Sequence, residues 1–243
     1  MGAIVALCTS SSPSSIISEL QDAAVKDALL VSLKTTVAAL AIIVFSGIPF
    51  ALLIGFRKGW LGTGLEFIVT LPTILPPSVA GLALLLAFGR RGLLGQFLAP
   101  YGIHIGFTPV AVMMAQVLVA TPFFVREAAN AFQAMPPSVM ESARLDGASS
   151  FQLLQRIILP GAAPFLITGA ILAWARALSE FGATILFAGS LQGVTQTLPI
   201  AIYIGFETNL EVAKALGIIL LLVAGITLIL LRVLFRRSLV YAH

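Results

Sequence analysis

Residues 161–187 read GAAPFLITGAILAWARALSEFGATILF, an apolar run whose only charged side chains are Arg176 and Glu180. A helix needs about 20 mostly apolar residues to cross the hydrocarbon core of a bilayer, and this run is long enough. The rest of the chain has the same character, because 59% of its 243 residues are hydrophobic and 10% are charged. Soluble domains carry about 25% charged residues. The composition therefore excludes a soluble enzyme, a nucleic-acid-binding domain and a disordered chain, and it predicts an all-α membrane protein.

Further apolar runs of spanning length flank this one. They cover residues 29–56, 64–88, 109–125 and 215–235. Together the runs predict a polytopic bundle of about five transmembrane helices. The second run contains Pro72, Pro76 and Pro77, so we expect it to be kinked or broken. The run at 198–206 is too short to span and is predicted to lie at the membrane interface.

The basic residues predict the orientation of the bundle. One set of loops holds eight of them and the opposite set holds four. The first set comprises Arg57, Lys58, Arg126, Arg144, Arg156, Arg232, Arg236 and Arg237, and the second Lys26, Lys34, Arg90 and Arg91. Cytoplasmic loops carry the excess of Lys and Arg, so we expect residues 1–28 to form an external tail and 236–243 a short cytoplasmic tail. Arg90 and Arg91 run against this rule.

The polar stretch 135–160 reads MPPSVMESARLDGASSFQLLQRIILP and falls on the predicted cytoplasmic side. Ser138 with Glu141, and Ser149 with Gln152, have the spacing of capping boxes that begin helices. Gly147 can take the left-handed conformation that ends a helix. The stretch thus predicts a short helix, a turn and an amphipathic helix. Two interpretations remain open: the loop packs on its own spans, or its small outward residues Ser142, Ala143 and Ala148 dock a soluble partner.

The two charges of the fourth run are one helical turn apart and can form an ion pair. Neither should face lipid, since a charge at the bilayer centre costs about 2.5–3.5 kcal/mol on insertion scales. Small residues recur on the same predicted face, and Thr184 continues it. The pair either fixes helix packing, or Arg176 attracts an anion into a path that Glu180 orients. Pro76 and Pro77 are candidates for the same path, because irregular backbone is tolerated beside a cavity; a plain kink is the alternative.

These motifs carry a resemblance. Glu141-Ser142-Ala143, then Gly147, then Ile157-x-Leu159-Pro160 resemble the "EAA" loop of ABC-importer permeases, with Ser142 in place of Ala. Over residues 31–232 the chain is similar to the molybdate permease family, which is related to the tungstate and sulfate/thiosulfate permeases. The segments that carry this similarity are LPTILPP (71–77), GRRG (89–92), WARALSEFGAT (174–184) and TQTLP (195–199).

The resemblance implies a type I ABC importer permease fold over 29–235 and import of a tetrahedral oxyanion, among which these segments favour molybdate. It implies a second copy of the chain, cytoplasmic ABC ATPase subunits and an external oxyanion-binding protein as partners in the inner membrane. It also implies ATPase coupling through the loop at 135–160, by Glu141, Ser142, Ala143, Gly147, Ala148, Leu159 and Pro160. None of the four lysines lies in a P-loop motif. We therefore expect ATP and Mg to bind the partner ATPase, with no cofactor or metal in this chain.

Two other classes of function agree less well with the sequence. A secondary transporter or channel would need no ATPase and would leave the fixed spacing of the loop unexplained. The sequence lacks the reactive groups that an intramembrane enzyme needs, because Cys8, His104 and His243 cannot form a nucleophilic site or a metal site. We therefore expect the chain not to be an enzyme, and to bind no nucleic acid.

Overall fold

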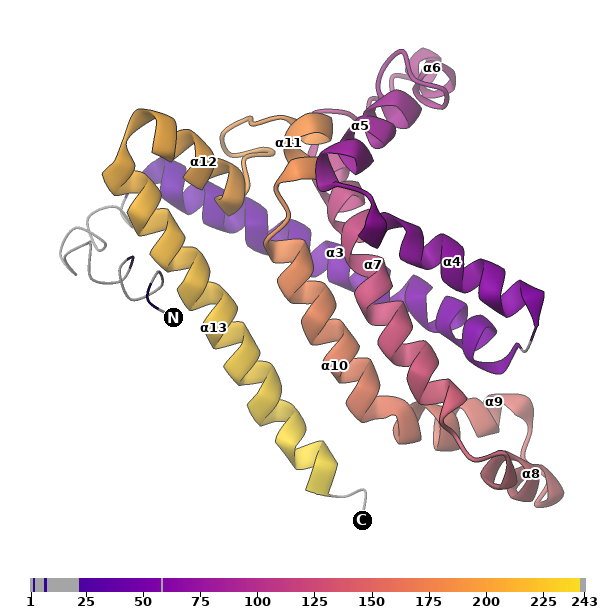
Figure 1. The fold of residues 1–243 in the computed structure, drawn as a ribbon. Helices are drawn as coiled ribbons and strands as arrows, with labels where there is room; N and C mark the ends of the chain where they lie inside the picture. The colour runs from indigo at the N-terminus through magenta and orange to yellow at the C-terminus, as the bar shows by residue number, and fades with distance from the viewer. Residues whose placement is uncertain (1, 3–6, 8–21, 58, 241–243) are drawn as a thin grey trace.

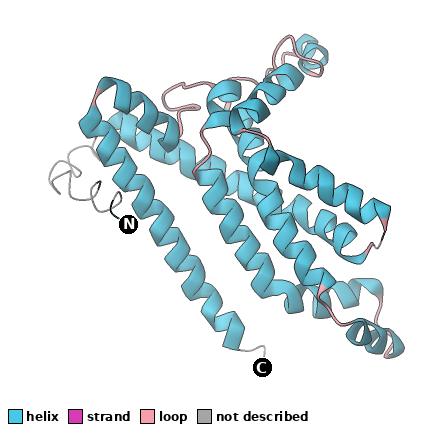
Figure 2. Ribbon diagram, in the orientation of Figure 1, coloured by secondary structure: helices cyan, strands magenta, loops and turns pink. Residues whose placement is uncertain are grey.

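A computed structural model describes residues 2, 7, 22–57 and 59–240, with side chains as far as Ile229. In this described part the chain is helical and forms no strand (Figure 2). Residues 1, 3–6 and 8–21, which make up most of the predicted external tail, and residues 241–243 of the predicted cytoplasmic tail lie outside it. The helices in chain order are α3 (Ala23–Phe56), α4 (Trp60–Ile74), α5 (Pro77–Phe88), α6 (Gly95–Leu98), η1 (Ala99–Tyr101), α7 (Pro109–Gln133), α8 (Pro137–Leu145), α9 (Ser150–Leu153), η2 (Leu154–Ile158), α10 (Leu159–Leu178), α11 (Gly182–Ala188), α12 (Leu198–Thr208) and α13 (Leu210–Val240).

The predicted number of spans is confirmed within the described residues. Four helices are long and apolar enough to cross a membrane, namely Ala23–Phe56, Pro109–Gln133, Ser150–Leu178 and Leu210–Ile229. The pair α4 and α5, which is bent by 110°, makes a fifth crossing if it is counted as one broken span. The start of α3 and the end of α13 lie at opposite ends of the bundle (Figure 1).

Small residues let the central helices approach closely. A Cβ placed on Gly47 of α3 would lie 2.6 Å from the Phe124 ring of α7, and one on Gly55 would lie 2.7 Å from Cβ of Phe132. Phe124 and Phe132 are fully buried in the main core cluster. Without such glycines α3 and α7 could not pack side by side as they do in Figure 1.

The fourth predicted span differs from the structure. We expected one run over 161–187, but α10 ends at Leu178 and the short helix α11 starts at Gly182. The span therefore breaks at residues 179–181, and Thr184 does not continue the face of α10. At its other end the helix is longer than expected, since it continues without interruption from Ser150.

This continuity explains how the chain passes through Pro160, which has no backbone N–H to donate. Residues Leu154–Ile158 form a π-helical turn, in which the N–H of Leu159 bonds to the carbonyl of Leu154. The wider turn absorbs the proline, so that the cytoplasmic amphipathic helix and the membrane span form one helix.

Candidate functional site

The loop between α7 and α10 has the predicted helix–turn–helix form. Gly147 follows α8 with φ of +82°, a left-handed conformation that disfavours other residues. The N–H of Ala148 donates to the carbonyl of Ala143 at 3.0 Å, which closes the end of α8. Ser149 and Gln152 form the predicted reciprocal capping box. The turn and the start of the second helix are thus confirmed.

The first predicted capping box is wrong. Pro136 precedes α8, and no side chain caps its first turn. Pro137 occupies the first helical position, where its fixed φ begins the helix and its missing N–H leaves one less donor to satisfy. Ser138 and Glu141 are instead exposed on the surface of α8.

The structure also revises which residues of this loop face outward. Ala143 is buried in the main core cluster and Ala148 is half-buried, against the prediction that both point away from the spans. Glu141, Ser142 and Gly147 are exposed. At the start of α10, Leu159 is half-buried and Pro160 is exposed.

Two apolar side chains of this loop were missed in the sequence. Leu145 at the end of α8 is 88% exposed, and Phe151 at the start of α9 is 65% exposed. Beside them lies a hollow of about 280 Å³, lined by Asp146, Gly147, Ala148, Gln152, Arg156 and Ile157. Exposed apolar side chains around a hollow are typical of a contact surface for another protein. An isolated Leu beside Asp and Gly gives no such signal in the sequence.

The other predicted site lies at the break between α10 and α11. Arg176 Nη2 is 2.6 Å from Oε2 of Glu180, as the spacing predicted. The second carboxylate oxygen, Oε1, accepts a hydrogen bond of 2.8 Å from the N–H of Ala183 in α11. The Glu180 side chain is fully buried, whereas that of Arg176 is 25% exposed. Glu180 thus holds the two halves of the broken span together.

The break in the second span lies against the break in the fourth. A Cβ on Gly182 would lie 3.0 Å from Cβ of Pro77, and one on Gly81 would lie 2.6 Å from the carbonyl oxygen of Ala183. The first turns of α5 and α11 therefore pack backbone to backbone. Pro76 directly precedes α5 and Pro77 begins it, so both prolines sit at the bend itself. Thr184 is buried on α11, and its Oγ1 has no hydrogen-bond partner.

A polar node beside this break was not predicted. Gln116 of α7 is buried, and its Nε2 donates to Oγ1 of Thr36 at 3.1 Å and to the carbonyl of Ala177 at 3.3 Å. One turn earlier on α3, Oγ of Ser32 accepts from the N–H of Leu198 at 2.7 Å. These bonds satisfy the end of α10 and the start of α12, which the breaks leave open in the membrane.

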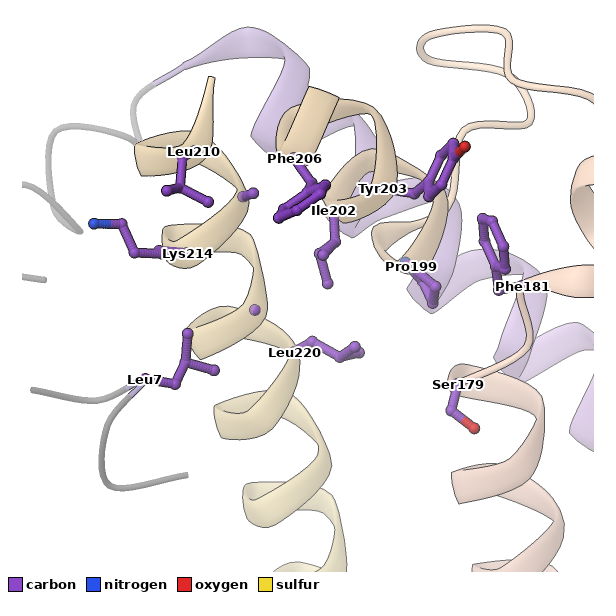
Figure 3. A pocket seen from close by; sticks show the side chains of 12 residues that line it. Leu7, Ser179, Phe181, Pro199, Ile202, Tyr203, Phe206, Leu210, Lys214 and Leu220 are labelled. Carbon is purple, nitrogen blue, oxygen red and sulfur yellow. The ribbon is translucent and has the colours of Figure 1, made fainter. Parts of the chain in front are cut away.

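An apolar cavity of about 530 Å³ opens beside the same break (Figure 3). Ser179 and Phe181 line it from the break, and α12 and α13 supply most of its remaining lining. Phe181 and Tyr203 face one another with ring centroids 5.3 Å apart, which links α12 to the break. Outside the membrane spans, the carboxylate of Glu207 raises the pKa of the Tyr203 phenol by hydrogen bonding and charge repulsion.

Over the part of the chain that the structure describes, no three His, Cys, Asp or Glu side chains are grouped to hold a metal ion. The structure brings the candidate path residues Arg176, Glu180, Thr184, Pro76 and Pro77 into one region around the two breaks. It places the loop residues at the far end of the helix Ser150–Leu178.

This architecture, with two broken spans in contact and a helical loop at one end, is that of a polytopic α-helical membrane protein. Residues 47–240 match the family model described as binding-protein-dependent transport system inner membrane component. The chain therefore belongs to this family of inner-membrane transport components. Members are permeases rather than enzymes, as we expected of this chain.

Relatives and solved structures agree with this assignment. The chain is 41% identical over 202 residues to the molybdenum transport system permease protein ModB of Mycobacterium tuberculosis, covering 83% of this chain and 76% of that protein. It is 36% identical to the probable transport system permease protein NifC of Clostridium pasteurianum, covering 96% and 82%. The fold is shared with a bacterial ABC transporter that imports alginate, with a TM-score of 0.76 at 18% identity over 93% of this chain and 84% of that one.

Proposed function

We propose that this chain is the permease subunit of an ATP-driven importer for molybdate. The identity to a molybdenum permease over most of both chains supports the substrate. The single structural observation that carries the mechanism is the helix Ser150–Leu178, which joins the cytoplasmic loop directly to the charged break in the membrane.

In this proposal the loop binds a separate ATPase subunit. Glu141, Ser142 and Gly147 are exposed for contact, with Leu145 and Phe151 as apolar anchors beside them. Ala143, Ala148 and Leu159 hold the loop on the spans, and Pro160 lies where the loop helix becomes the span. ATP and Mg bind to the partner, and closure of the partner moves the loop as a unit.

At the break between α10 and α11, the proposal concerns contact with the transported anion. Arg176 is the charged group of the break that is partly exposed, so it can meet a passing dianion. Its ion pair with Glu180 offsets much of its charge, which keeps the attraction weak enough for release. Thr184 and the bend at Pro76 and Pro77 lie in the same region, and we assign them to the wall of the path.

The complete assembly in this proposal contains a second copy of the chain, ATPase subunits and an external oxyanion-binding protein, set in membrane lipid. In this proposal the N-terminus lies outside the cell membrane and the C-terminus lies in the cytoplasm. This orientation places the loop between α7 and α10, with Arg144 and Arg156, on the ATPase side.

Uptake of radioactive molybdate by vesicles tests the proposal. The permease is reconstituted with a molybdate-transport ATPase and an oxyanion-binding protein, and uptake is followed with and without ATP. We expect uptake only with ATP and all partners present. Equal uptake by the permease alone would favour a channel or secondary transporter. Competition by excess tungstate or sulfate separates molybdate from the alternative oxyanions, and stronger inhibition by unlabelled sulfate than by unlabelled molybdate would reassign the substrate.

A further inference from the structure

The segment between α5 and α7 projects away from the bundle as an arm (Figure 1). This outer arm comprises residues 89–108, GRRGLLGQFLAPYGIHIGFT, and includes the short helices α6 and η1. Large apolar and aromatic side chains are exposed along it: Leu93 is 74% exposed, Phe97 67% and Tyr101 81%. A soluble loop would not display so many apolar groups to water.

The backbone packing of the arm keeps these apolar side chains exposed. A Cβ on Gly92 would clash with the carbonyl oxygen of Leu86, and one on Gly95 would clash with the carbonyl oxygen of Gly89. The N–H groups of Leu93 and Leu94 bond to the last turn of α5 at 3.0 and 2.7 Å. The arm is thus folded tightly onto the end of α5, and its apolar side chains cannot collapse inward.

The charge of the arm is equally one-sided. Arg90 and Arg91 are both exposed, and residues 89–108 contain no Asp or Glu. Neither arginine forms an ion pair with a carboxylate in the described part of the chain, where the pairs are Arg176 with Glu180 and Lys214 with Glu211. The two arginines are also the exception to the positive-inside rule. An anionic group outside this chain would complement them.

The length of α5 fits an arm at the membrane surface. Its 12 residues give about 18 Å of helix, close to half of a hydrocarbon core of about 30 Å. A bend near mid-depth would then bring the end of α5 to the headgroups. We propose that the outer arm lies in the outer headgroup layer, with Phe97, Tyr101 and Leu93 at the acyl boundary and Arg90 and Arg91 on the phosphates of anionic phospholipid.

The orientation given under the proposed function decides only which leaflet the arm contacts, and the lipid contact itself does not depend on it. Aromatic and apolar side chains next to unpaired arginines are the composition of interfacial anchors. A water-soluble protein partner with an acidic face would match the arginines but not the rigid apolar display, and a second copy of the arm would bring like charges together.

Fluorescence in lipid nanodiscs tests the anchor. In full-length permease carrying Cys8→Ser, Phe97→Cys is labelled with an NBD dye, and quenching by brominated phosphatidylglycerol is compared with quenching by brominated phosphatidylcholine. We expect both lipids to quench and the anionic one to be preferred, by up to about fivefold per arginine. The further change Arg90→Gln with Arg91→Gln should bring the preference close to one. A label at Ser142→Cys, in the cytoplasmic loop, is the matched control and should be quenched by neither lipid.

Three outcomes would overturn the proposal. Quenching of the Phe97→Cys label by iodide and not by lipid would place the arm in water. Protection from both quenchers would mean that protein covers the arm. Equal quenching by both lipids, unchanged by the arginine substitutions, would remove the phosphate contact. Nanodiscs expose both faces, so none of these results depends on orientation; labelling of Ser142→Cys by an impermeant reagent in sealed vesicles tests that separately.

Discussion

The side-chain amide of Gln116 lies 3.3 Å from the carbonyl oxygen of Ala177 and so ties α7 to the broken end of α10. The two residues are 61 positions apart in the chain. The same amide bonds to Thr36 of α3, which makes Gln116 the point where three spans meet through polar groups.

Replacing Gln116 with Leu should therefore reduce molybdate uptake severalfold while the fold survives. The free energy of unfolding should change by no more than about 1 kcal/mol, because losing the unpaired Oε1 offsets part of the loss of two hydrogen bonds. Uptake by vesicles and thermal unfolding in detergent measure the two effects. Gln133→Leu, on the exposed surface of the same helix, is the control and should leave both unchanged. Full uptake by Gln116→Leu would contradict the role of the node.

The ion pair allows its structural and transport roles to be separated. Arg176→Gln alone strands a fully buried carboxylate and should cost about 3 kcal/mol of stability. The double change Arg176→Gln with Glu180→Gln leaves no buried charge unpaired, and the new amide can still accept from Ala183. We expect this variant to unfold near the wild-type temperature and yet to import poorly, since the attraction for the anion is gone. Normal uptake by the double variant would make the pair purely structural.

The contact between the two breaks predicts a steric effect at Gly81. Gly81→Ala would push a methyl group against the carbonyl of Ala183, 2.6 Å away, and should destabilise the permease by about 1–3 kcal/mol. Gly64→Ala in α4 meets nothing within 4 Å and should be neutral or stabilising, by up to about 1 kcal/mol. Thermal unfolding of the two variants side by side checks this. Equal midpoints would mean that α5 and α11 do not pack as described.

The left-handed turn of the cytoplasmic loop predicts a coupling defect. Gly147→Val should distort the turn, because a β-branched residue is strongly disfavoured at φ of +82°. ATP hydrolysis by the assembled complex should then no longer respond to the loaded binding protein, while the permease stays in the membrane. Gly147→Asn is the control, since Asn tolerates this conformation. Oxyanion-dependent ATPase activity of Gly147→Val equal to that of the Asn variant would refute the coupling role.

The contact between Tyr203 and Glu207 predicts a pH dependence of stability. Its pKa is raised above 10.0 by Glu207, so the folded state holds the phenolic proton more tightly than the unfolded state. The resulting stabilisation is fully present below the unfolded pKa and is lost as the pH rises through the folded one. Glu207→Gln should lower the pKa of Tyr203 toward its ordinary value, measured by ultraviolet titration of the phenol against a Tyr203→Phe reference. Identical titrations of the wild type and the Glu207→Gln variant would exclude the contact.

Most of the architecture could be predicted because membrane spans are recognisable in a sequence by their length and apolar content. The bend in the second span followed from its prolines. The ion pair, Gly147 and the second capping box followed from spacings of a few residues, and the structure confirms all three. These features involve residues only a few positions apart, so their spacing can be read from the sequence.

The errors arose where the cause is not local. Nothing in residues 176–182 forbids a continuous helix before Gly182. The span breaks where the carboxylate of Glu180 accepts from the N–H of Ala183 and where α5 packs against α11. A single Gln within an apolar run likewise gives no sign of partners on α3 and α10. Ala143 looked free to face outward because its burial depends on helices from other parts of the chain.

The π-helical turn at Leu154–Ile158 has a mechanical consequence. The helix from Ser150 to Leu178 has 29 residues and is therefore a rod about 40 Å long. In the proposed coupling, a displacement imposed on the turn at Gly147 would reach the break at Glu180 through that rod. The wide turn accommodates an extra residue per turn without interrupting the rod. A pull on the loop would thus be delivered to the charged break along one continuous helix.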